Sequence, residues 1–189
     1  MNFENLSIVS VRHVDAPQVV TSSEIQSELA DTMGRLGLPE NLLEGLAGIH
    51  ERRFWNEQTE PSDAATMAAE VALEEADLDR SRLGILINTS VCRDFVEPST
   101  ACLVHGNLKL PDTCMNFDVG NACLAFLNGM EIVGNMIERG QIDYGMVVDG
   151  ESSRFLIEST IARLKRPETD MATFREEFAS LTTGSGAVA

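Results

Sequence analysis

Short apolar runs alternate with segments of helical periodicity along the 189-residue chain. Residues 83–89 form a continuous apolar run, which is typical of a buried parallel strand. Residues 115–119 and 144–149 are similar runs, and residues 6–14 are rich in β-branched residues with apolar alternation. These four segments are predicted to be strands, and the small residues after Gly184 are predicted to begin another.

Helices are predicted between these strands. Thr21 and Glu24 have capping-box spacing, so a helix is expected from there to about Leu36, before Gly37. Another helix begins at residues 61–63 and presents a face of alanines, and further helices are expected at 100–108, 158–165 and 173–178. Alternating strands and helices predict right-handed crossovers and a mostly parallel sheet with helices on both faces.

The segment from Cys123 to Arg139 has the strongest helical pattern. Its polar residues recur every three or four positions and form one narrow stripe: Asn128, Glu131, Asn135 and Glu138. The other faces are apolar, as expected for a core helix, and Gly129 and Gly134 would let a neighbouring backbone approach closely.

The charge of the chain excludes some classes of partner. A formal net charge of −16 and a pI near 4.4 would repel nucleic acid and anionic membranes. Arg52 and Arg53 are the local exception, because they could still meet an anionic ligand or an interface. The 43% hydrophobic content predicts a globular α/β protein that buries a real core.

The cysteines predict free thiols. Four cysteines without a CxxC pair, and only three histidines, give no zinc-ligand spacing, so no metal is expected. The N-terminal residues lack the features of a signal peptide, and no apolar run reaches membrane-spanning length. We therefore expect a cytoplasmic protein without membrane insertion.

Cys123 is the candidate nucleophile. It follows a short strand at a sharp turn into the long apolar helix, an arrangement that resembles the nucleophile elbow of hydrolases. A thiol there would face unpaired backbone N–H groups and the positive end of the helix dipole, which favour the thiolate. The alternative is a buried structural cysteine, a common fate of free thiols.

Several motifs together resemble the thiolase superfamily, within it the ketoacyl synthase III-like condensing enzymes. They are residues 118–123 (DVGNAC), 88–90 (NTS), 147–151 (VVDGE), 48–52 (GIHER) and 184–187 (GSGA). In initiating ketoacyl synthases the residue before the Pro98-Ser99 pair is a large apolar one, whereas Glu97 stands here. A glutamate at this position is similar to the acyl-CoA condensing thiolases of bacterial olefin biosynthesis.

The resemblance implies a fold and a reaction. The fold would be a thiolase-like α/β fold, layered α/β/α/β/α in the complete enzyme, of which residues 1–189 would form the N-terminal mixed-sheet half. Cys123 would be acylated by one fatty acyl-CoA. Glu97 would be the general base that deprotonates the second, acting in the partner subunit's site of a homodimer. The product of this non-decarboxylative head-to-head Claisen condensation would be a β-keto acid.

The resemblance also implies site residues that the chain does not contain. The histidine and asparagine that complete such sites lie on motifs of the family's second half, so a C-terminal half or a complementing chain is an expected partner. His105 does not match that histidine and is interpreted as structural. No cofactor is expected beyond coenzyme A as the substrate's carrier. Three alternatives stay open: a decarboxylative ketoacyl synthase III-type enzyme, thioester hydrolysis, and a non-catalytic partner subunit of a thiolase-like complex.

Overall fold

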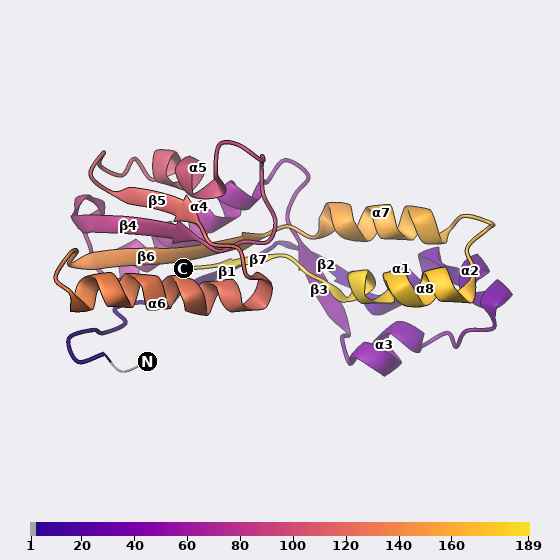
Figure 1. Ribbon diagram of the computed structural model, residues 1–189. Coiled ribbons are helices and arrows are strands. Elements are labelled where there is room, and N and C mark those ends of the chain that lie inside the picture. Colours follow the sequence, from indigo (N-terminus) through magenta and orange to yellow (C-terminus); the bar gives the residue numbers. More distant parts are fainter. Residues whose placement is uncertain (1–2) are drawn as a thin grey trace. The chain divides into compact units, whose positions relative to one another are not determined.

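The computed structural model describes residues 3–189 and divides the chain into two compact units (Figure 1). The sheet unit contains the N-terminal residues up to Asp15, residues 58–151 and residues 186–189. The helical unit contains residues 16–57 and 152–185. No helix among residues 3–189 is long and apolar enough to cross a membrane.

The sheet unit is built on a five-stranded mixed sheet in the order β1-β7-β6-β4-β5. The strands are β1 (His13–Asp15), β4 (Leu83–Asn88), β5 (Met115–Asp118), β6 (Tyr144–Glu151) and β7 (Gly186–Val188). β4 is parallel to β5 and β6, whereas β7 is antiparallel to both β6 and β1. The parallel prediction holds for β4, β5 and β6, and β4 is buried as its apolar run predicted.

Helices cover both faces of this sheet, as expected. They are α4 (Pro61–Glu75), α5 (Thr100–Asn107) and α6 (Ala125–Glu138), and a short 3-10 turn, η1 (Arg80–Arg82), precedes β4. A Cβ added at Gly150 would lie 2.7 Å from the backbone nitrogen of Ala65 in α4, and one at Gly145 would lie 2.5 Å from Val133 in α6. Because residues five apart on a strand face opposite sides, α4 and α6 pack on opposite faces.

The N-terminal strand is much shorter than predicted. Residues 6–14 were expected to form it, but β1 contains only His13–Asp15. The reason is that a strand needs a ladder partner: β7 pairs with His13–Asp15, Ala189 bonds Arg12, and residues 6–11 have no paired strand within the described residues. Ile8, Val9 and Val11 consequently remain more than half exposed.

The helical unit has its own core. It contains the antiparallel hairpin β2 (Gln18–Thr21) and β3 (Glu51–Phe54), the helices α1 (Ser22–Glu28), α2 (Ala30–Leu36), α3 (Leu42–Ala47), α7 (Arg154–Leu164) and α8 (Met171–Glu177), and η3 (Phe178–Thr182). The Thr21–Glu24 capping box is confirmed. The single predicted helix breaks in two at Leu29, whose backbone departs from helical geometry and whose side chain is buried.

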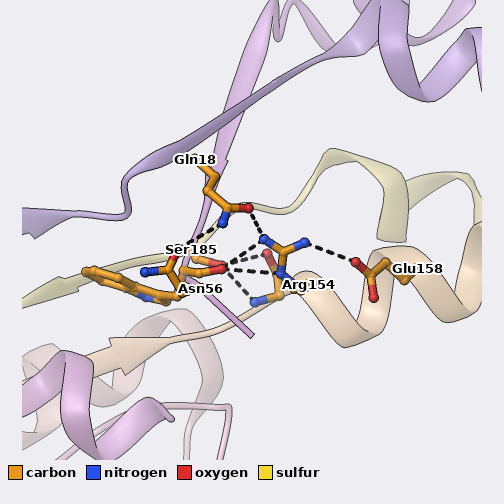
Figure 2. A network of polar contacts seen from close by, with 7 residues as sticks. Gln18, Asn56, Arg154, Glu158 and Ser185 are labelled. Atoms are coloured by element: carbon orange, nitrogen blue, oxygen red, sulfur yellow. Dashed lines mark hydrogen bonds and ion pairs between the residues drawn. The ribbon is translucent and has the colours of Figure 1, made fainter. Parts of the chain in front are cut away.

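Arg154, the first residue of α7, joins this helix to the hairpin (Figure 2). Its guanidinium donates to the Trp55 carbonyl at 2.9 and 3.2 Å, to the Gln18 side chain, and to Glu158 at 3.1 Å. Gln18 in turn donates to Asn56 at 2.9 Å. These contacts satisfy backbone and side-chain groups at the point where the two segments of the helical unit meet.

Candidate active site

The candidate site residues lie at one edge of the sheet. In the parallel strands Asn88 of β4 pairs with Asp118 of β5 and with Val148 of β6, so β4 and β5 end at the same level and β6 continues beyond them to Glu151. Cys123 follows β5, and Glu97 lies on the loop that follows β4. The carboxyl ends of parallel strands form one edge, which is where ligand sites of α/β sheets occur.

Cys123 lies in a 3-10 turn, η2 (Ala122–Leu124), between β5 and α6. The sequence placed it in the first turn of the long helix, but the α-helix begins at Ala125, two residues later. Ala122 has a φ of +45°, a left-handed conformation that is uncommon for a residue with a Cβ. The strand therefore turns sharply at the residue before the thiol, and the Cys123 side chain is exposed.

The two glycines of α6 are required by close contacts. A Cβ at Gly129 would lie 2.9 Å from Val147 and 3.2 Å from Thr89, and one at Gly134 would lie 2.7 Å from Phe3. The prediction of a close neighbour at both glycines holds, but the neighbours are side chains and not the backbone that the sequence led us to expect. Only one face of α6 is covered within the described residues, since Leu124 before it and Leu127 on it are 59% and 57% exposed.

The Glu97 loop is anchored on both sides while Glu97 itself is exposed. The Asp94 carboxylate accepts from the Ser62 hydroxyl at 2.6 Å, at the start of α4. The Glu151 carboxylate accepts from the backbone N–H groups of Val91 at 2.6 Å and Cys92 at 3.1 Å. These bonds fix the loop that carries Glu97, whose next peptide bond, to Pro98, is cis.

Asp118 connects the two candidate residues through the backbone. Its carboxylate accepts from the N–H groups of Thr100 at 3.1 Å and Ala101 at 2.8 Å, in the first turn of α5. It also accepts from the Asn88 side chain at 3.3 Å. The strand that leads to Cys123 is thereby bonded to the helix that follows Glu97. In the sequence Asp118 stands only as the first residue of the DVGNAC motif, and no local spacing indicates this role.

Two carboxylates lie near the end of β6. Asp149 and Glu151 lie on the same face of the strand because they are two residues apart. Burial raises the pKa of Asp149, the charge of Glu151 raises it further, and a hydrogen bond from the Thr89 hydroxyl at 3.0 Å partly opposes the rise. The two acids flanking Gly150 were the only sequence signal for this pair.

Exposed apolar side chains surround the candidate residues on the sheet unit. Strand β5 is an edge strand, and Met115 and Phe117 on it are 48% and 38% exposed. Val91, Phe95 and Val96 on the Glu97 loop are 62%, 59% and 88% exposed. Large apolar side chains gathered on loops and an open strand edge are typical of a surface that another chain or domain covers.

Other residues that the sequence singled out have internal roles. The Nε2 atom of His105 lies 3.2 Å from the Pro111 carbonyl oxygen, in keeping with a structural interpretation. Arg52 is only 4% exposed and donates to the Ser22 hydroxyl at 2.9 Å, and burial lowers its pKa. The proposal that it meets an external anion therefore has no support from its placement.

The remaining cysteines differ from Cys123 in their surroundings. Cys102 is exposed, Cys92 is half-buried, and Cys114 is buried, which raises its pKa. Among residues 3–189, no three His, Cys, Asp or Glu side chains gather in a group that could hold a metal ion.

The chain is similar over its whole length to known proteins, although no family model matches it. It is 51% identical to the acyl-CoA:acyl-CoA alkyltransferase of Xanthomonas campestris and 41% identical to that of Shewanella oneidensis, over all 189 residues in both cases. Over 105 residues it is 36% identical to the β-ketoacyl-[acyl-carrier-protein] synthase III of Natranaerobius thermophilus. The chain spans 56% and 54% of the length of the two alkyltransferases.

Solved structures agree with this relationship. The chain superposes on a structure of a Xanthomonas campestris OleA variant with a TM-score of 0.97 and 50% identity, covering 100% of this chain and 58% of that one. A structure of the same protein with cerulenin bound gives a TM-score of 0.96 over 98% of this chain. In sequence and in its thiolase-like α/β fold, the chain therefore matches the N-terminal half of the OleA acyl-CoA:acyl-CoA alkyltransferases.

Proposed function

We propose that this chain is the nucleophile-bearing half of an enzyme that condenses two long-chain fatty acyl-CoA molecules, with Cys123 as nucleophile and Glu97 as base. The observation that carries the proposal is the position of Cys123, exposed at the sharp turn between β5 and α6 directly after Ala122 with its left-handed backbone. The names of the full-length relatives supply the substrate class.

The first step is acylation of Cys123. Its thiolate attacks the carbonyl carbon of one acyl-CoA, a carbon–sulfur bond forms, and the bond to coenzyme A breaks. Coenzyme A leaves as a thiolate that takes up a proton. Cys123 is exposed for this attack, and it precedes α6, whose first turn has no side-chain cap to compete for its N–H groups.

The second step forms the carbon–carbon bond. The Glu97 carboxylate removes a proton from the carbon next to the thioester of the second acyl-CoA, and the resulting carbanion attacks the Cys123 thioester. The Cys123 thiolate leaves and a β-ketoacyl-CoA is formed, which water hydrolyses to a β-keto acid and coenzyme A. Glu97 removes the proton efficiently when an apolar acyl site covers it and desolvates its carboxylate.

The site requires additional protein to become complete. Glu97 is exposed, and the apolar side chains around it and along β5 are uncovered within the described residues. A homodimer would bury this surface and place Glu97 in the partner's acyl site. A C-terminal half would cover α6 and supply the groups that bind the thioester oxygen.

The proposal is tested by acylation of the enzyme completed with its C-terminal half. Mixed with a saturated long-chain acyl-CoA, the protein should gain one acyl mass, and the Cys123→Ala variant should gain none. The matched control is Cys102→Ala, because Cys102 is the other exposed cysteine. An acyl mass that persists in Cys123→Ala, or that disappears in Cys102→Ala, would remove Cys123 as the nucleophile.

Product analysis separates the alternatives. A β-keto acid formed from two acyl-CoA molecules supports condensation without decarboxylation. Free fatty acid as the only product would identify thioester hydrolysis, and a requirement for a malonyl donor would identify ketoacyl synthase chemistry. Slow alkylation of Cys123 that acyl-CoA does not protect against would identify a non-catalytic subunit.

A further inference from the structure

The loop that carries Glu97 begins where the backbone ladder between β4 and β6 ends. The N–H of Thr89 donates to the Val148 carbonyl at 2.8 Å, as in the ladder. At the next step a side chain replaces the backbone, because the N–H of Gly150 donates to the Ser90 hydroxyl at 2.7 Å. The N–H groups that follow Ser90 therefore need an acceptor from outside the ladder.

The Glu151 carboxylate is that acceptor. Its Oε1 atom accepts from the N–H of Val91 at 2.6 Å, and its Oε2 atom accepts from the N–H of Cys92 at 3.1 Å. Hydrogen bonds to an ionised acceptor are roughly twice as strong as neutral ones. Glu151 is the last residue of β6 and is half-buried, so one side chain of the sheet holds two consecutive N–H groups at the start of the loop.

A second carboxylate holds the end of the same loop in the same way. Asp118, the last residue of β5, accepts from the N–H groups of Thr100 and Ala101 at 3.1 and 2.8 Å. Between these two attachments, residues 95–98 are exposed. The position of Glu97 is thus set by bonds to the backbone on either side of it, which residues on two strands of the sheet provide.

We infer that Glu151, through its bonds to the N–H groups of Val91 and Cys92, is a positioning residue for Glu97; this rests on the proposed role of Glu97 as the base. A base removes a proton only from within hydrogen-bond reach of it, and a misplacement of about 1 Å can cost on the order of 100-fold in rate. In this role the Glu151 carboxylate does not touch the substrate. It acts by keeping the loop, and with it the Glu97 carboxylate, in one place.

The effect of Glu151 should be confined to the second step of the reaction. Cys123 lies in the turn between β5 and α6, whereas the two bonds of Glu151 end on the loop between β4 and α5. Loss of those bonds frees the base and leaves the turn of the nucleophile in place. Acylation and condensation should therefore respond differently, which general damage to the fold would not produce.

The test uses the enzyme completed with its C-terminal half. In Glu151→Ala, acyl-Cys123 should form at the parent rate while the β-keto product falls by on the order of 10- to 100-fold. Asp149→Asn is the matched control and should change neither step, because Asp149 lies on the same face of β6 but accepts from the Thr89 hydroxyl. If Glu151→Ala fails to fold, Glu151→Gln keeps the side-chain volume and one acceptor, and should show a smaller loss that is confined to condensation.

A double variant separates positioning of the base from an independent effect. In Glu97→Gln the base is already lost, so adding Glu151→Ala to that background should lower condensation no further, within about twofold. Losses that multiply would show that Glu151 acts on the reaction by another route and would overturn the inference. Equal losses of acylation and condensation in Glu151→Ala alone would overturn it as well.

Hydrogen exchange tests the contact itself, without any use of activity. In Glu151→Ala the amides of Val91 and Cys92 should exchange with deuterium faster by on the order of tenfold or more. The amides at the start of α5, which Asp118 holds, should keep the parent rate. Unchanged exchange at Val91 and Cys92 would show that Glu151 does not hold the loop and would overturn the inference.

Two outcomes distinguish a wrong base from a wrong positioning residue. Unchanged condensation in Glu97→Gln would reject the proposed base, and the role of Glu151 with it. If Glu97→Gln blocks condensation and Glu151→Ala does not, the base stands and only the role of Glu151 is overturned.

Discussion

The Asp118 carboxylate accepts a hydrogen bond of 2.8 Å from the backbone N–H of Ala101, and so joins the strand before Cys123 to the helix after Glu97. The same carboxylate bonds the N–H of Thr100 at 3.1 Å. Orphan N–H groups of a helix start are thus satisfied by a neighbouring strand, in addition to the Ser99 cap of the same helix.

Replacement of Asp118 should destabilise the protein and loosen the Glu97 loop. Asp118→Ala removes the acceptor for two N–H groups of α5, and we expect a loss of about 1–2 kcal/mol in the free energy of unfolding. Urea denaturation measures it. Asp112→Ala on an exposed turn is the control and should stay within about 0.5 kcal/mol of the parent. An equal loss of unfolding free energy in both variants would contradict a stabilising role for the bonds from α5 to Asp118.

Glu97→Gln should separate acylation from condensation in the enzyme completed with its C-terminal half. Glutamine keeps the shape of the side chain and cannot accept the proton, so acyl-Cys123 should form at the parent rate while the β-keto product falls by on the order of 100-fold or more. Mass spectrometry of the protein and of the product measures the two steps. Glu168→Gln, on an exposed loop, should change neither. Unchanged condensation in Glu97→Gln would exclude Glu97 as the base.

Gly150→Ala should be strongly destabilising. The added Cβ would lie 2.2 Å from the Pro61 carbonyl oxygen and 2.7 Å from the Ala65 nitrogen, and these backbone atoms can move only if α4 moves. We expect a loss of about 3 kcal/mol or more, above the usual cost of overpacking. Gly106→Ala in α5 has nothing within 4 Å and should be neutral or more stable by up to about 1 kcal/mol. Thermal unfolding measures the stability of both variants against that of the parent.

Asp149→Asn should stabilise the protein at neutral pH. Burial and the charge of Glu151 raise the pKa of Asp149 in the folded state, so its contribution to stability is present at low pH and is lost as pH rises through the folded pKa. Above its folded pKa the Asp149 carboxylate therefore opposes folding, whereas asparagine still accepts from Thr89. The gain in stability should shrink as pH falls through the folded pKa and should be gone below about 4, the unfolded value. If urea denaturation showed the same gain in the free energy of unfolding at every pH, the raised pKa of Asp149 would be contradicted.

Local sequence patterns determined many of the secondary-structure elements of this protein. The apolar run of β4, the capping box at Thr21 and the alanine face of α4 each depend on neighbouring residues, and the structure confirms all three. The motifs around Cys123 and Glu97 also led to the resemblance that the comparisons confirm, because each motif consists of residues adjacent in the chain.

Other features depend on contacts between distant segments, and only the tertiary structure decided them. The first strand shrank to His13–Asp15 because its pairing depends on β7, which lies far away in the sequence. The hydrogen bonds that the Asp118 and Glu151 carboxylates accept join residues 17 and 60 positions apart, and no spacing in the sequence predicts them. Residues next to each other in the chain fix local geometry, whereas ladders, buried charges and close packing require the partner segment to be in place.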